Sequence, residues 1–163
     1  TATTEIYTLS LHDALPDLDW MVLDSISTDI GRPSHLAESL AGLMGDDSEW
    51  EELVVPDLEQ NFNVQCRYVQ EAVESAREQN SQAIFIKAHN ADKWYGALNQ
   101  ARMSLQARYD IHGLDNFEDA PEELRSAHFR DRFYLTLQGV LLEYVMGNSW
   151  EKFEGCKMAQ LKS

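Results

Sequence analysis

The sequence predicts a mainly α-helical, single-domain bundle, and three observations lead to this fold class. The chain has 163 residues, which suits one domain with one core. Hydrophobic residues make up 44% of it and charged residues 25%, as in globular proteins. Apolar residues recur every three or four positions over several long segments, which is the spacing of one helix face. Such faces leave water by packing against one another, so we expect the helices to form a bundle.

Three helices are expected in the first half of the chain: Leu18–Ile30, a short one capped by Ser34, and one from about Asn61 to Glu78. We expect the strongly acidic run Asp46–Glu59 to be a solvated loop and helix start, with a docking patch for a basic partner as the alternative. The apolar stripes of the three helices are Leu18, Val22, Ile26 and Ile30, then Leu36, Leu40 and Leu43, then Phe62, Cys66, Val69, Val73 and Ala76.

The second half is expected to hold one short strand and two helices. Ala83–Ile86 is a β-prone run that suits one strand of a minimal two-stranded ribbon with an N-terminal segment. A helix capped by Asn90 or Asp92 follows and ends at Gly113, and a longer helix covers Glu122–Met146. Their predicted faces are Trp94, Leu98, Ala101, Leu105 and Arg108 or Tyr109, then Phe129, Phe133, Leu137, Val140, Leu141 and Tyr144.

The first sixteen residues are similar to a non-biological peptide. They match, without a mismatch, the translation in one frame of a common sequencing-library adapter. We therefore interpret residues 1–16 as an adapter-derived artefact and exclude them from functional argument. This divides the chain into the artefact, a helical domain over 17–148 and a C-terminal tail over 149–163. The alternative is a genuine strand over Ile6–Leu11, and in either case this segment can pair with the edge of the Ala83–Ile86 strand.

The charge balance argues against several classes of partner. There are 13 Lys and Arg residues against 28 Asp and Glu, a formal net charge of -15. Such a chain repels phosphate backbones and anionic lipid, so we expect neither nucleic acid nor a membrane as partner. We also expect no membrane span and no signal peptide. The cysteines Cys66 and Cys156 lie far apart, which suits a reducing cytoplasm, and we predict a cytoplasmic protein.

Motifs of catalysis and metal binding are not found along the chain. There is no Glu-x-x-His or His-Glu-x-x-His spacing, no P-loop and no nucleophile elbow. His35 with Glu38, and His128 with Asp131, lie one turn apart, but two groups do not complete a metal site, and we expect His128 to be exposed. Cys66 lies in an apolar stripe and is expected to be a small core residue. We therefore predict no catalytic residue, metal or cofactor, and enzymatic activity stays an open question that the motifs argue against.

One polar constellation stands out. Asn99, Arg102 and Gln106 are three and four positions apart, so they share a polar stripe beside the apolar one of the same helix. Half-buried Asn and Arg side chains together suit the binding of a carboxylate or a carbonyl. The structural alternative is an ion pair between Arg102 and an acid of a neighbouring helix, such as Glu71 or Glu74.

The same helix carries a resemblance to a known family. Trp94-x-x-Ala97-Leu98-Asn99-x-x-Arg102 resembles the Trp-x-x-Ala-Leu-Asn-x-x-Arg helix of a bacterial family of unknown function, number 2017 in that series. Counterparts of the Pro56-Asp57 step and of the Tyr134–Val145 helix extend the resemblance over roughly Asp17 to Gly147. This chain departs from the family after Tyr109, where Asp110-Ile111-His112 replaces the usual Leu-Gly-Ile.

The resemblance implies an all-helical cytoplasmic domain, best known in actinobacteria and encoded there near the Clp protease adaptor and a sulfur-carrier peptidase. It brings no established activity, so no catalytic residue carries over. Trp94, Asn99 and Arg102 carry over as motif positions, and we take them as the candidates for ligand or partner binding.

Three functions follow from these observations. The first is a non-enzymatic protein-interaction or accessory factor with a protein partner, which the resemblance links to protein turnover. The second is a small-molecule (carboxylate) binding protein or enzyme with an inter-helix site at Asn99 and Arg102, joined by Tyr68 or Arg67. The third is a transcriptional regulator, which the negative charge opposes.

Overall fold

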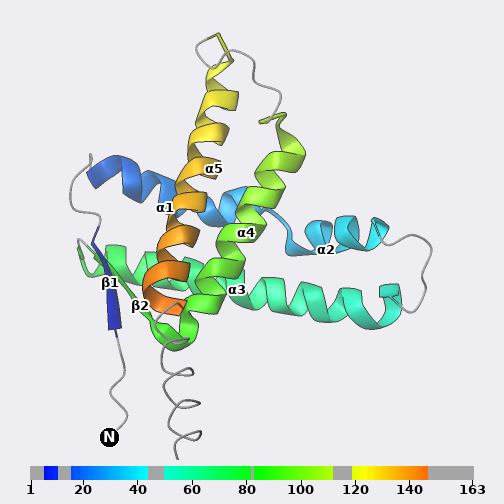
Figure 1. Ribbon diagram of the computed structural model, residues 1–163, viewed down its shortest axis with the longest axis horizontal. Helices are drawn as coiled ribbons and strands as arrows, with labels where there is room; N and C mark the ends of the chain where they lie inside the picture. Colours follow the sequence, from blue (N-terminus) through cyan, green and yellow to red (C-terminus); the bar gives the residue numbers. More distant parts are fainter. Residues whose placement is uncertain (1–5, 11–15, 44–49, 82, 112–118, 147–163) are drawn as a thin grey trace, which may run out of the picture.

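Five α-helices around one core make up most of the molecule (Figure 1). The computed structural model describes residues 6–10, 16–43, 50–81, 83–111 and 119–146. A two-stranded sheet lies beside the helices, which confirms the predicted mainly α class with a minimal ribbon. The elements are β1 (Ile6–Ser10), α1 (Pro16–Ile30), α2 (Pro33–Gly42), α3 (Val55–Glu78), β2 (Ala83–Lys87), α4 (Ala91–Arg108) and α5 (Glu122–Val140).

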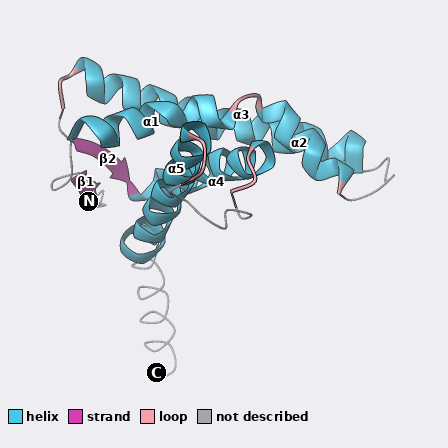
Figure 2. Cartoon of the chain, turned by 90° about the horizontal axis from the view of Figure 1, so that it is seen from above, coloured by secondary structure: helices cyan, strands magenta, loops and turns pink. Residues whose placement is uncertain are grey.

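The helices form two layers with α4 at the centre. In Figures 1 and 2, α1 and α2 run along α3, and α4 and α5 lie side by side across them. Helix α4 contacts α1, α3 and α5, and its residues Trp94, Ala97 and Leu98 are at most 2% exposed. These residues are three and four positions apart, so they share one helix face, and the core forms against that face. Within the described residues, no helix is long and apolar enough to cross a membrane.

The ribbon pairs β1 with β2 in antiparallel register, with Ile6 opposite Lys87. In β2, Ile84 and Ile86 are each 3% exposed and belong to the core, whereas Phe85 between them is 59% exposed. This alternation is that of a half-buried strand. The predicted pairing of the N-terminal segment with this strand is confirmed, and backbone hydrogen bonding alone suffices for it whatever the origin of residues 1–16.

Helix α1 buries Val22, Ile26 and Ile30 of the stripe expected of it, and the side chain of Leu18 lies outside the described residues. The start and the buried side of α2 differ from the prediction. The N-cap residue of α2 is Arg32, not Ser34, and Pro33 lies in the first turn. The fixed φ of proline suits that turn, which explains the earlier start. Leu43, expected on the apolar side, is 81% exposed. The buried residues are Leu36, Ala37 and Ala41.

Helix α3 begins earlier than the predicted Asn61. A π-helical turn, η1 (Trp50–Val54), leads directly into α3, with Pro56 in the first turn. The second part of the acidic run is therefore helical, which fits the helix start expected within this run, while residues 44–49 lie outside the described residues. The predicted stripe faces the core: Val69 and Val73 are buried, and Phe62, Cys66 and Ala76 are half-buried.

A 3-10 turn, η2 (Ala88–Asn90), precedes α4, and Asn90 is its N-cap residue without a side-chain capping bond. Helix α4 ends at Arg108, before the predicted Gly113, which lies outside the described residues. The backbone of Tyr109 is extended, with φ -127° and ψ 136°. This turn brings Ile111, 6% exposed, into the core. Burial of Ile111 therefore explains the early end of the helix.

Helix α5 is continued by a π-helical segment, η3 (Leu141–Met146), and together they have the predicted extent. The buried face matches the predicted stripe in part: Leu137 and Leu141 are buried and Phe133 packs against the core, but Phe129 is 42% exposed. The buried residues of this segment are Ala127, Asp131, Tyr134, Leu137, Gln138 and Leu141. The polar ones among them form hydrogen bonds with α1 and α4. The side chain of Tyr144 and the tail 149–163 lie outside the described residues.

Candidate functional site

Arg102 on α4 forms an ion pair with the facing side of α5. Its Nε donates to Oδ1 of Asp131 at 3.1 Å, and its Nη1 donates to Oε1 of Gln138 at 2.9 Å. The side chains of Arg102 and Asp131 are 20% and 5% exposed, so the pair is largely removed from water. An ion pair with a neighbouring helix is therefore present, but the acid is Asp131 of α5 and not Glu71 or Glu74 of α3.

The Asp131 carboxylate is shared within this cluster. Gln106, one turn after Arg102, also donates to Oδ1 of Asp131, at 3.0 Å. Gln138 uses its Nε2 to donate to the backbone oxygen of Tyr95 at 3.3 Å. Buried polar groups are stable when they satisfy one another in this way. The position at Arg102 that was considered for a carboxylate ligand is thus held by a carboxylate of the protein itself.

The three candidate residues of the Trp94 motif make contacts in different places. Trp94 is 2% exposed and belongs to the hydrophobic core. Arg102 reaches α5, whereas Asn99 is exposed and its amide donates only along α4, to Sδ of Met103 at 3.5 Å. Gln106 joins Arg102 at Asp131 and Asn99 does not, so the structure divides the predicted polar stripe. Tyr68 and Arg67 lie on α3, and Tyr68 has Lys93 Nζ 5.4 Å from its ring centroid.

Gly96, inside the motif, allows α3 and α4 to approach closely. A Cβ at this position would overlap the side chain of Gln65 on α3. Gln65 in turn accepts a bond of 2.7 Å from Nε2 of Gln100, which also donates to the backbone oxygen of Phe62 at 3.3 Å. Oε1 of Gln100 is buried and has no hydrogen-bond partner among the described residues. The motif glycine therefore makes room for a buried amide contact between helices.

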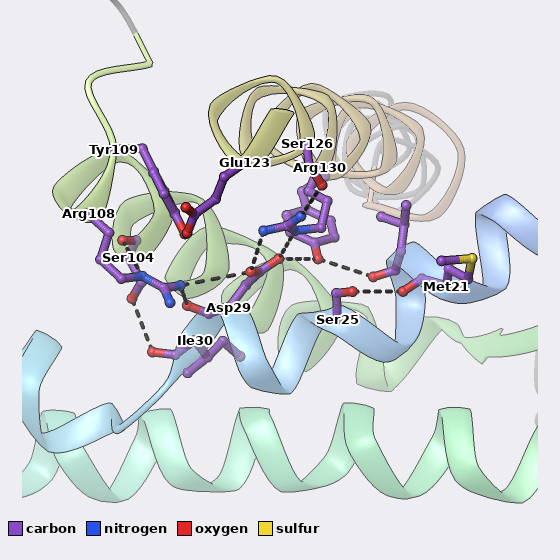
Figure 3. A network of polar contacts seen from close by, with 12 residues as sticks. Met21, Ser25, Asp29, Ile30, Ser104, Arg108, Tyr109, Glu123, Ser126 and Arg130 are labelled. Atoms are coloured by element: carbon purple, nitrogen blue, oxygen red, sulfur yellow. Dashed lines mark hydrogen bonds and ion pairs between the residues drawn. The ribbon is translucent and has the colours of Figure 1, made fainter. Parts of the chain in front are cut away.

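A second buried carboxylate, Asp29 at the end of α1, connects α1 with α5 (Figure 3). Asp29 is 3% exposed. Arg130 donates to both of its oxygens, from Nε at 2.7 Å and from Nη2 at 3.2 Å. The hydroxyl of Tyr134 lies 2.8 Å from Oδ2 of Asp29 and 3.1 Å from the backbone oxygen of Val22. Ser126 supports this geometry, since its hydroxyl is 2.6 Å from Nη1 of Arg130.

Arg108, in the last turn of α4, extends the network to the α1–α2 turn (Figure 3). Its Nη2 donates to the backbone oxygen of Asp29, and its Nε donates to that of Ser104 at 3.2 Å. Ser104 donates from its hydroxyl to the backbone oxygen of Ile30 at 3.2 Å. These contacts close the C-terminal end of α1, whose last carbonyls have no partner within the helix.

Burial and charge shift the acidity of groups in the network. Burial, together with the neighbouring Asp29 carboxylate, raises the pKa of Tyr134 well above its usual value, so this phenol stays neutral. Burial alone would lower the pKa of Arg130, but its hydrogen bonds to Asp29 and the charge of that carboxylate outweigh this and raise it. Asp29 therefore accepts a hydrogen bond from a phenol that stays neutral and pairs with the guanidinium of Arg130.

The cluster around Asp29 was not predicted from the sequence, although the spacing of the residues in α1 and α5 contains a signal for it. Asp29 follows Ile26 by three positions and so extends the apolar stripe of α1. Ala127, Asp131 and Tyr134 likewise step by four and three. A charged residue on an otherwise apolar helix face requires a buried partner. Such a residue in an apolar stripe therefore predicts a buried ion pair or hydrogen bond.

Among the described residues, no group of three or more His, Cys, Asp or Glu side chains could hold a metal ion. His128, expected to be exposed, is half-buried. Burial raises the pKa of the Cys66 thiol, which favours its protonated form and lowers its reactivity.

A comparison with protein-family models shows which family the chain is related to. A family model described as "Domain of unknown function (DUF2017)" matches residues 38–145. The chain belongs to this family. The match to DUF2017 begins within α2 and ends within η3, so it includes the Trp94 motif, Arg102 and Asp131. It is narrower than the resemblance over Asp17 to Gly147, because α1 and its Asp29 lie outside it. No curated protein and no solved structure matches the chain.

Proposed function

We propose that this DUF2017 domain is a non-enzymatic protein-interaction module, an accessory factor that acts by binding another protein. One observation carries the proposal: the guanidinium of Arg102, the polar feature of the family motif, is bonded to Asp131 and Gln138 inside the molecule. The motif thereby contributes to packing α4 against α5. What remains for recognition is the surface, which has a strongly acidic balance.

The acidic surface suggests what kind of partner would associate. With 28 acidic against 13 basic residues, electrostatic attraction favours a basic protein surface and speeds its encounter. The same charge disfavours nucleic acid, which was the third hypothesis. The family resemblance adds protein turnover as the setting, since its genes lie near a protease adaptor.

Affinity capture followed by reconstitution tests the proposal. The tagged domain is incubated with bacterial lysate at moderate salt, and an unrelated helical domain of similar net charge is the control bait. We expect at least one protein enriched over the control, which then forms a complex of defined stoichiometry with the purified domain in analytical ultracentrifugation. Failure of every enriched protein to reconstitute such a complex would contradict the proposal.

The carboxylate-binding alternative has its own test. Thermal unfolding is measured with a panel of small carboxylates, for the wild type and for Arg102→Lys, which keeps the charge but loses the second donor to α5. We expect no acid to raise the midpoint of the wild type through this residue. A carboxylate that stabilises the wild type and not Arg102→Lys would favour a ligand site at Arg102 over an interaction module.

A further inference from the structure

A small pocket lies where the turn between α1 and α2 meets the end of α4. Its volume is about 200 Å³. Its lining includes apolar residues, namely Ile30, Leu36 and Ala107, which are called the apolar wall below. It also includes three basic residues, namely Arg32, His35 and Arg108. Three basic residues in one pocket are notable on a chain with a net charge of -15.

The two guanidinium groups differ in how they are held. Arg108 is fixed by its bonds to the backbone oxygens of Asp29 and Ser104, and its Nη2 is 3.8 Å from Oδ1 of Asp29, a carboxylate that Arg130 also pairs with. Its Nη1 has no partner in the part of the chain that the structure describes and can donate to a ligand. The side chain of Arg32 makes no hydrogen bond or ion pair with the described residues. The pocket therefore offers one positioned cation and one free cation to a bound anion.

The size of the pocket limits its ligand. Sites for drug-sized molecules and cofactors have volumes of about 300–1,000 Å³. The present pocket is smaller, at about 200 Å³, so it suits one side chain with an attached anionic group and not a nucleotide. The apolar wall requires that the side chain be apolar. An apolar group that carries a single carboxylate fits both requirements.

We propose that this pocket binds the C-terminal residue of a partner polypeptide. The terminal carboxylate accepts hydrogen bonds from Arg32 and Arg108, and the last side chain, an apolar one, packs on Ile30 and Leu36. Capture of a terminal carboxylate is a recurring mode of peptide recognition. This inference rests on the proposed interaction function and names the part of the partner that is bound.

Charge and exposure favour a polypeptide over a free acid. Arg32, His35 and Ala107 are exposed, so the pocket is open and a chain can leave it. An open site of this size makes few contacts with a free small acid, and these contacts offset only part of the entropy lost on binding. A polypeptide gains further contacts outside the pocket, and basic residues before its C-terminus are attracted by the net negative charge of the chain.

Peptide binding to the full chain tests the proposal. The probes are fluorescent five-residue peptides, Lys-Gly-Lys-Ala-X, with X being Ala, Val, Leu or Phe, each as the free acid and as the C-terminal amide. We expect at least one free acid to bind with a dissociation constant below about 1 mM and its amide to bind at least tenfold more weakly. Equal binding of acid and amide, or no binding by any free acid, would overturn the proposal.

Three variants locate the site. Arg32→Glu should raise the dissociation constant of the free-acid peptide at least tenfold. Ala107→Trp should have the same effect, because it fills the pocket without a change of charge. Arg132→Glu is the matched control, because Arg132 is exposed on α5, its side chain makes no bond to the described residues, and it undergoes the same charge change away from the pocket. A loss in Arg132→Glu equal to that in Arg32→Glu would show general electrostatics and contradict a site here. Thermal unfolding confirms that each variant is folded.

The source of the carboxylate is tested separately. N-acetylleucine and N-acetylphenylalanine compete for the labelled peptide, and we expect each to bind at least tenfold more weakly than it. Equal affinity would assign the pocket to free small acids and overturn the proposal for a polypeptide.

Failure of the pocket proposal can be told apart from failure of the proposed function. A captured partner that binds Arg32→Glu as tightly as the wild type would exclude this pocket, while the interaction function would stand.

Discussion

At the scale of single residues, two buried carboxylates hold three helices together. Asp29 of α1 accepts hydrogen bonds from Arg130, and Asp131 accepts one from Arg102 of α4. The consecutive residues Arg130 and Asp131 of α5 therefore form ion pairs of opposite polarity with two different helices. Each acid has further hydrogen bonds, which buried charges require. Such pairs add little net stability compared with apolar residues, but they are sensitive to loss of one partner. Their effect is to fix how α5 lies on α1 and α4.

Removal of Asp131 should strongly destabilise the fold. In Asp131→Ala, Arg102 keeps its position between the helices but loses the carboxylate, and Gln106 loses an acceptor. An uncompensated charge of this kind costs about 3 kcal/mol. Urea unfolding at neutral pH measures the loss. Glu71→Gln, exposed on α3, is the control and should change the free energy of unfolding by less than about 0.5 kcal/mol. Similar effects in both variants would show that the ion pair is not formed in solution.

Tyr134 should make stability depend on alkaline pH. Its pKa is raised in the folded state, so its contribution is complete below the unfolded value of about 10 and is lost as the pH rises above it. Well above pH 10, the free energy of unfolding of the wild type should fall by up to about 1.4 kcal/mol per pH unit more than that of Tyr134→Phe. Urea unfolding between pH 8 and 11.5 would show this, and parallel curves would contradict it. At neutral pH the variant should lose about 1 kcal/mol of hydrogen bonding.

At the scale of elements, the close contact between α3 and α4 depends on the absence of a side chain. Gly96 lies in the interior of α4, where glycine is less favourable than alanine by about 1 kcal/mol. The structure offsets this, because the missing Cβ leaves room for Gln65 and its bond to Gln100. Local helix propensity and inter-helix packing thus favour different residues at this position.

A double-mutant cycle separates the two effects. Gly96→Ala should destabilise the wild type by about 1 kcal/mol, because displacement of Gln65 leaves the buried amide of Gln100 without its partner. In a Gln65→Ala background, the same change should stabilise the protein by up to about 1 kcal/mol, since only the gain in helix propensity remains. Chemical denaturation of the four proteins gives the coupling energy. A change of the same sign in both backgrounds would refute the contact.

Another lesson at this scale comes from α5. The predicted stripe is right at Leu137 and Leu141, which are buried, but Phe129 is 42% exposed. The inward face also carries Asp131, Tyr134 and Gln138, because these find partners on α1 and α4. Periodicity alone found the helix, its length and the apolar part of its buried face. It did not find the polar part, since burial of a polar residue depends on what lies opposite.

At the scale of the whole molecule, net charge opposes compactness. A formal charge of -15 produces self-repulsion in the folded state, which salt screens. The Debye length falls from about 30 Å at 0.01 M salt to about 8 Å at 0.15 M. The buried ion pairs of Asp29 and Asp131 are screened much less than the surface charges. Added salt should therefore stabilise the protein on balance.

We expect the midpoint of thermal unfolding to rise by several degrees between about 0.01 M and 0.15 M NaCl. The control is the double variant Glu38→Lys and Glu71→Lys, at two exposed acids that make no bond to the described residues. Its net charge is less negative, so its midpoint should respond less to salt. Calorimetry measures both, and a lower midpoint at the higher salt concentration would show that attractive surface pairs dominate instead.

The sequence by itself determined the helical class, the approximate extent of α1, α3 and α5, the strand at Ala83–Ile86 and the family motif. These features depend on local spacing and on residues close together in the chain. The tertiary structure alone decided that Arg102 pairs with Asp131, that Asp29 joins Arg130 and Tyr134, and that Arg32 and Arg108 line one pocket. A hydrogen bond or ion pair depends on distances between helices that are remote in sequence, and hydrophobic periodicity carries no information about the partner that satisfies a buried charge.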